Sequence, residues 1–205
     1  MVKIFFVCRR REGLAVSDYR QMVLREHVPL ALEHHRTMLR YEINLVAAVP
    51  PGAPETVSIP ALCFESLADY QNRLYDTEEG HAAIEADAAR FMGGADAYLT
   101  QEMVLTEGRS RGPIGHRTRG EKTLVLLQTR PGTTAGMLSQ ALETLAERGA
   151  RLVLNPVSRR LSEGGQDWNA FIELHDSIGA ETVEDLASEL VSRVTCYPVD
   201  EYVEK

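Results

Sequence analysis

The order in which strands and helices are expected along this chain restricts its fold more than any other sequence feature. Apolar runs and alternating segments predict strands, and apolar residues at helical spacing predict helices. The order strand, helix, strand, strand, helix, strand is expected over residues 1–107 and again over residues 122–205. Residues 108–121 are rich in glycine and arginine and lack periodicity, which is typical of a linker between two halves.

Each half therefore has the element order of a ferredoxin-like βαββαβ unit. A sheet with helices on one face leaves its other face uncovered, and two such sheets can cover each other by packing face to face. We therefore predict an α+β fold, in which two ferredoxin-like βαββαβ halves pack sheet to sheet as an intramolecular α+β barrel. A chain of 205 residues is long enough for one compact unit of this kind.

Local signals place several of these elements. The run VKIFFVCRR at residues 2–10 predicts a central strand that is covered on both faces. Ser17 is a candidate N-cap for the first helix, and Pro29 is expected to bend that helix. Ser66 with Asp69 three residues later resembles a capping box, which predicts the start of a further helix.

Charge and composition exclude several classes of function. The formal net charge of −8 opposes binding to nucleic acid or to anionic lipid, so the basic residues of 108–121 are better explained as a solvated linker. No apolar run approaches the roughly 20 residues that span a bilayer, and the first residues lack the core of a signal peptide. We therefore expect a cytoplasmic protein without a membrane partner.

The chain shows no motif for a metal or an organic cofactor. Cys8, Cys63 and Cys196 lie far apart in apolar stretches, without the spacing of a zinc site, so we expect reduced core residues. The glycine-rich nucleotide motifs and the GxSxG hydrolase motif are missing from the sequence. The expected chemistry is cofactor-free, with no metal and no haem.

Two segments carry a resemblance to a known family. REHVPLALEHH contains His27-Val28-Pro29 and precedes the strand-like LRYEINLV, and AIEADAARFMGGADAYLTQEMVL places Asp87 and Phe91 on a helix before another strand. In these features, roughly over residues 2–106, the chain resembles the EthD family of dimeric α+β barrel proteins. Ala88 stands where that family more often has a second acid, and residues 122–205 contain no His-x-Pro.

The candidate catalytic residues are His27 and Asp87. An imidazole changes charge near neutral pH and can exchange a proton with a substrate, and Asp87 would orient that imidazole or stabilise its charged form. The alternatives are a core histidine that fixes a bent helix and a solvated carboxylate. The candidate ligand-binding residues are Tyr19, Tyr41, Tyr70, His81 and Phe91, for which packing or surface exposure is the alternative.

Glu173 and His175 form a second candidate pair. They follow Phe171 at alternating positions of an expected strand, so the three side chains share one face. The pair is a candidate for proton transfer, and a structural or surface role is the alternative.

The resemblance implies an enzyme that uses His27 for acid/base chemistry on a small apolar or aromatic carbonyl compound, as a lyase, decarboxylase or isomerase. The alternative is a non-catalytic binding or accessory protein of a degradation or biosynthetic pathway, because a fold does not settle a function. A structural oligomerisation module is a third class, for which no enclosed cavity is expected. Either a monomer or a homodimer agrees with the tandem arrangement.

Overall fold

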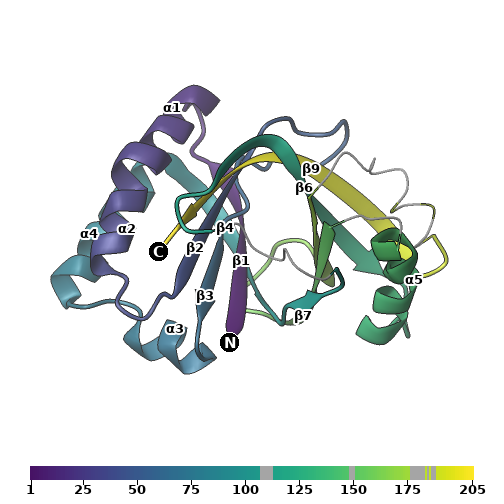
Figure 1. The fold of residues 1–205 in the computed structure, drawn as a ribbon. Coiled ribbons are helices and arrows are strands. Elements are labelled where there is room, and N and C mark those ends of the chain that lie inside the picture. Colours follow the sequence, from purple (N-terminus) through teal and green to yellow (C-terminus); the bar gives the residue numbers. More distant parts are fainter. Residues whose placement is uncertain (107–112, 148–150, 176–182, 184, 186–187) are drawn as a thin grey trace.

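The structure is a computed structural model, and it describes residues 1–205 except 107–112, 148–150, 176–182, 184 and 186–187. Its architecture is mixed α+β, with an eight-stranded antiparallel barrel and helices on the outside (Figure 1). The predicted fold class is confirmed.

The first half contains the elements expected for one βαββαβ unit, with short additions. They are β1 (Val2–Arg10), α1 (Val16–Met22), the π-helical η1 (Val23–His27), α2 (Val28–His34), β2 (Arg40–Val46), β3 (Ala61–Phe64), α3 (Leu67–Arg73), α4 (Glu78–Phe91), β4 (Met92–Thr100) and β5 (Met103–Val104). No helix in the described part of the chain is long and apolar enough to cross a membrane.

The second half repeats the strand order. Its elements are β6 (Arg117–Thr129), α5 (Ala135–Glu147), β7 (Arg151–Arg160), β8 (Ala170–His175) and β9 (Val191–Glu204). The sequence predicts a second helix in this half, beginning at Thr182, and that helix falls largely outside the described residues. β6 begins inside the segment expected to be a linker, because Arg117 to Arg119 pair with β9. The boundaries of the two halves remain a prediction.

Hydrogen bonding closes the strands into a barrel. The order is β4-β1-β3-β2-β9-β6-β8-β7, with β5 added beside β7 and a further pairing between β4 and β7. β2 joins β9 from Tyr41 opposite Glu204 to Val46 opposite Val199, and β4 joins β7 near Tyr98 and Arg160. The two sheets are thus connected at both edges as well as packed face to face.

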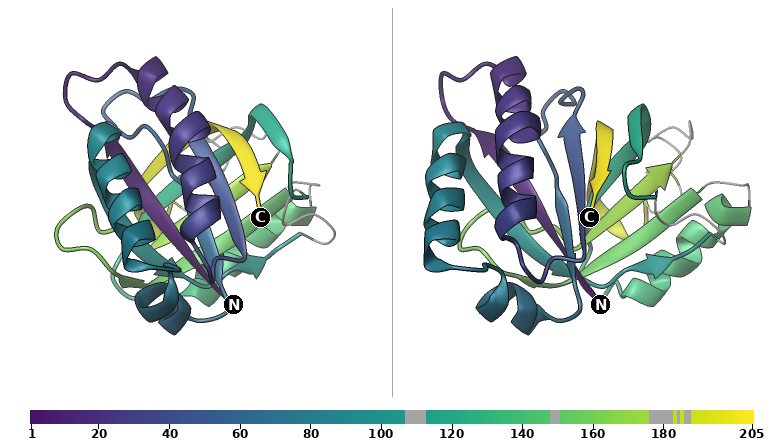
Figure 2. Two further views of the ribbon diagram at one scale, coloured as in Figure 1. Left: turned by 90° about the vertical axis from the view of Figure 1, so that its left-hand side faces the viewer. Right: turned by 60° about the vertical axis from the view of Figure 1, so that its left-hand side comes forward.

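Three apolar clusters fill the layers. One lies between the first-half strands and the helices α1 to α4, a second packs around α5, and a third fills the barrel interior. Figure 2 shows α1, α2 and α4 over the first-half strands, and Figure 1 shows α5 on the opposite side. Alternation along β1 sends Ile4 to the helix side and Phe5 into the barrel, where Phe5 stacks on Phe171 at 4.7 Å.

The helix starts agree only in part with the expected caps. The Ser66 hydroxyl accepts a hydrogen bond from the Asp69 backbone N–H, and the Asp69 carboxylate accepts one from Ser66, so the predicted capping box is confirmed. Ser17 as an N-cap was wrong, because α1 begins at Val16, after Ala15. The helix turns into the π-helical η1 shortly before Pro29, consistent with the missing N–H of proline, and the bend expected there stays a prediction.

The two serines give a matched prediction of stability. Replacing Ser66 with alanine is expected to lower the free energy of unfolding by about 1 kcal/mol, because the first turn of α3 loses its side-chain acceptor. Ser17→Ala is expected to change it by less than about 0.5 kcal/mol, because that side chain is exposed and caps no helix. Urea denaturation followed by circular dichroism measures both, and equal losses would contradict the assignment of the cap.

Candidate functional site

His27 lies at the end of η1, directly before α2, and faces α4. Its side chain is mostly buried, with 12% exposed, and its Nδ1 lies 3.0 Å from Oδ2 of Asp87 on α4. These two residues are 60 positions apart in sequence, and the packing of α4 against η1 and α2 brings them together. The two candidate catalytic residues are therefore hydrogen-bonded to each other.

The carboxylate of Asp87 is held from its other side as well. Arg90 donates from Nη1 to Oδ1 of Asp87 at 3.0 Å and to Oε2 of Glu26 at 2.8 Å. Arg90 lies one helical turn after Asp87, so both side chains lie on the same face of α4. The arrangement fixes Asp87 and also joins η1 to α4.

The hydrogen bond sets the chemical state of the imidazole. A carboxylate accepts, so Nδ1 of His27 carries the proton and Nε2 keeps its lone pair. Burial lowers the pKa of His27 below its usual 6.5, and the hydrogen bond with Asp87 offsets only part of this effect. In the described residues no group bonds Nε2. At neutral pH, His27 is therefore an uncharged imidazole with a free basic nitrogen.

Aromatic side chains surround this pair. The ring of Phe91 lies edge-on to His27, with 5.1 Å between ring centres, and the ring centre of Tyr19 lies 5.4 Å from that of Phe91. The Tyr19 hydroxyl forms a hydrogen bond with the Ser58 hydroxyl at 2.7 Å, and burial raises the pKa of Tyr19. This hydroxyl is therefore already engaged with Ser58. The structure thus brings together His27, Asp87, Phe91 and Tyr19.

The other three candidate residues lie elsewhere. Tyr41 is buried in the core between the sheet and the helices, where burial raises its pKa. Tyr70 packs near Phe64 and lines a cleft of about 550 Å³. His81 is exposed, 3.1 Å from Glu85, and its ring stacks on Tyr75. His27 does not line the clefts of about 490, 550 and 320 Å³ in the described part of the chain.

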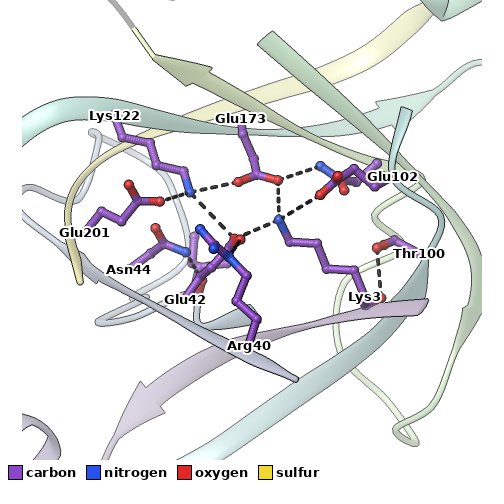
Figure 3. A network of polar contacts seen from close by, with 11 residues as sticks. Lys3, Arg40, Glu42, Asn44, Thr100, Glu102, Lys122, Glu173 and Glu201 are labelled. Atoms are coloured by element: carbon purple, nitrogen blue, oxygen red, sulfur yellow. Dashed lines mark hydrogen bonds and ion pairs between the residues drawn. The ribbon is translucent and has the colours of Figure 1, made fainter. Parts of the chain in front are cut away.

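Sequence reasoning missed a network of buried charges inside the barrel. Nζ of Lys3 on β1 lies 2.5 Å from Glu173, 2.7 Å from Glu42 and 3.5 Å from Glu102. Nζ of Lys122 on β6 lies 2.5 Å from Glu201 and 2.8 Å from Glu173 (Figure 3). Glu173 therefore lies between two ammonium groups.

The network is charged at neutral pH. Burial opposes the charge of Glu173, but Lys122 and Lys3 outweigh it and hold its pKa well below the usual range. Burial likewise opposes the charge of Lys3, but Glu173 and Glu42 raise its pKa above the usual value. Carboxylate oxygens of Glu42, Glu173 and Glu201 lie within 4.8 Å of one another, a donor set that suits a hard cation, but each of these carboxylates already pairs with Lys3 or Lys122.

The candidate pair Glu173 and His175 is part of the same surroundings. Glu173 accepts hydrogen bonds from Lys3 and Lys122 and one from Asn155 at 3.0 Å. Burial lowers the pKa of His175, and its Nε2 is buried without a hydrogen-bond partner among the described residues. Glu173 is thus engaged with lysines and an amide rather than with His175.

Three solved structures illustrate the similarity of this fold to those of known proteins. A putative monooxygenase from Fusobacterium nucleatum subsp. nucleatum has a TM-score of 0.63 at 8% identity, over 100% of this chain and 93% of that protein. An anthrone oxidase-like protein has a TM-score of 0.63 at 10% identity, over 97% and 90%. A putative monooxygenase from Lactobacillus acidophilus has a TM-score of 0.58 at 8% identity, over 100% and 95%. Such low identities show the fold alone.

No family model matches this chain, and no curated protein matches it. The structural neighbours named above therefore support the fold of this chain.

Proposed function

We propose that this chain is an EthD-like, cofactor-independent enzyme in which His27 carries out acid/base chemistry on a small apolar or aromatic carbonyl compound. The hydrogen bond between His27 and Asp87 carries the proposal, because it combines a neutral imidazole with a carboxylate that fixes its orientation. The His27-Val28-Pro29 motif and the position of Asp87 support it through the resemblance to that family.

The proposed reaction begins with proton removal. Nε2 of His27 takes a proton from a hydroxyl group, or from a carbon next to a carbonyl group, and leaves an enolate or phenolate. The carboxylate of Asp87 stabilises the imidazolium that forms. Return of the same proton to another atom of the substrate gives an isomer, and return to a carbon that has lost CO₂ completes a decarboxylation.

The name of one structural neighbour fits this substrate class. Anthrone, which that name contains, is an aromatic ketone with an acidic C–H group. A base that acts on such a group agrees with an uncharged His27 beside Phe91.

A non-catalytic small-molecule-binding protein is the second candidate. Two observations support it: His27 does not line the three clefts described above, and Asp87, Arg90 and Glu26 join η1 to α4. In that case His27 holds two helices together and reacts with nothing.

The two candidates differ in a substrate screen. Anthrones, phenols, quinones and unsaturated lactones are added to the purified protein, and thermal stabilisation and consumption of each compound are measured. Stabilisation with turnover of one compound class supports the enzyme. Stabilisation without turnover supports the binding protein, and a protein that responds to none of these compounds contradicts both.

The pH dependence of turnover is a further prediction. A histidine base is active when unprotonated, so the rate is expected to be constant near neutral pH and to fall as the pH drops through the pKa of His27. Because burial lowers that pKa, the fall is expected below pH 6.5, at about tenfold per pH unit. Initial rates measured across this range test it, and a rate that instead rises as the pH falls would assign His27 the role of an acid.

A further inference from the structure

A cleft of about 490 Å³ lies beside η1 and α2, at the start of β6. We propose that this cleft binds a small organic carboxylate with an apolar or aromatic body. His27 does not line the cleft, so the proposal goes beyond the acid/base chemistry proposed above and does not depend on it.

The first argument is charge. Three arginines line the cleft, namely Arg25 from η1 and Arg117 and Arg119 from β6, against one acid, Glu204. Nη2 of Arg117 lies 3.5 Å from Glu204, which leaves an excess of positive charge in a chain whose net charge is −8. A concave surface of one sign concentrates the electric field and attracts an ion of opposite charge.

The second argument is hydrogen bonding. The guanidinium group is a planar fork that binds a carboxylate through two parallel hydrogen bonds. Thr118, between Arg117 and Arg119, also lines the cleft, and its hydroxyl oxygen is buried without a hydrogen-bond partner among the described residues. A buried hydroxyl without a partner costs free energy, and a carboxylate oxygen would satisfy it after a small shift of the cleft wall exposes it.

The third argument is the apolar part of the lining. Leu24, Val28 and Ile43 line the cleft together with the ring of Tyr202. The Arg117 guanidinium lies 5.7 Å from the centre of that ring. The volume falls within the roughly 300–1,000 Å³ of small-molecule sites. An apolar body beside a carboxylate therefore uses both parts of the cleft, whereas an inorganic anion uses only the charged part.

The pairing of β6 with β9 explains why arginines from a presumed linker reach this place. Arg117 lies opposite Tyr202 and Arg119 opposite Asp200, and an irregularity of register follows between Arg119 and Lys122. The strand thus continues beyond the charged barrel interior, and its first residues form one wall of the cleft.

The test uses 2-naphthoate as the probe and isothermal titration calorimetry as the measurement. Wild-type protein is expected to bind 2-naphthoate at least about tenfold more tightly than acetate or the neutral 2-naphthalenemethanol, because each of these lacks one of the two recognised parts. The double variant Arg117→Gln/Arg119→Gln is expected to weaken binding by about tenfold or more. Arg36→Gln, at an exposed arginine outside the cleft, is the matched control and is expected to bind as wild type does.

Four outcomes would overturn the proposal. They are no binding of 2-naphthoate, equal binding of the neutral alcohol, an unchanged affinity in the double variant, and loss of binding in His27→Gln. The last outcome would place the carboxylate at His27, so it separates failure of this proposal from failure of the proposed function. Thr118→Val is a second, milder variant that keeps the shape of the side chain, and weaker binding in it supports the role of the hydroxyl.

Discussion

Replacing Lys122 with methionine is expected to lower the free energy of unfolding by about 3–5 kcal/mol at pH 7. The Lys122 ammonium group is buried and contacts the carboxylates of Glu201 and Glu173, with Glu42 at 4.0 Å. Methionine fills much of the space but leaves three buried carboxylates with one ammonium group fewer. Because a domain of this kind is stable by only about 5–15 kcal/mol, the loss is a large fraction of the total. Equilibrium unfolding in urea, followed by circular dichroism, measures it.

A double variant separates the charge effect from simple loss of packing. Lys122→Met/Glu201→Leu removes both members of one pair, so it is expected to recover much of the stability lost in Lys122→Met. The loss in Lys122→Met is also expected to be smaller at pH 5 than at pH 8, because protonation relieves the carboxylates left without a partner. A loss below about 1 kcal/mol, the value typical of exposed ion pairs, would contradict an enclosed network.

For any compound that the wild-type protein turns over, His27→Gln is expected to lower kcat by about 10²- to 10⁴-fold, the usual contribution of a general acid or base. The glutamine amide can still donate a hydrogen bond to Asp87, so the contact between η1 and α4 is kept. The amide does not accept a proton near neutral pH, so the chemical step is lost. Steady-state kinetics with the thermal unfolding midpoint of the same samples measures both properties.

The control for this variant is His81→Gln. His81 is exposed and pairs with Glu85, so its replacement is expected to leave kcat unchanged. If His27→Gln keeps wild-type kcat but unfolds at a lower temperature, His27 serves only to join the helices.

Much of the fold could be predicted because its signals are local. Alternation and apolar runs mark most of the strands, and apolar side chains at helical spacing mark most of the helices. Ser66 and Ser17 mark the limit of such signals. Asp69 three residues after Ser66 returns the hydrogen bond, whereas Arg20 stands three residues after Ser17 and cannot accept one. A serine alone was too weak a signal for an N-cap.

The charge network could not be predicted from local patterns. Lys3 stands in the apolar part of β1, and its closest partner, Glu173, is 170 positions away. Their contact exists only because both sheets turn one face into a closed barrel. A hint was available in β2, where Glu42 alternates with Tyr41 and Ile43 in a strand that proves to be buried on both faces.

The contact between His27 and Asp87 had partial support in the sequence. The resemblance to a family singled out both His27 and Asp87, whereas the distance of 3.0 Å between them comes from the packing of α4. The cleft lined by Arg117 and Arg119 was missed because a glycine- and arginine-rich segment without periodicity gave no sign that it pairs with β9.

The position of Glu173 between two lysines bears on why the halves share one chain. Lys3 and Lys122 occupy matching places on β1 and β6, but Phe5 pairs with Ala61 on β3 where the second half pairs Leu124 with Glu173. An assembly of two identical subunits obeys a two-fold axis and contains every side chain twice. A carboxylate beside both ammonium groups would then be duplicated, and the two copies would repel each other in the same small space. A single chain is free of that symmetry, so a homodimer of either half alone would not reproduce this interior.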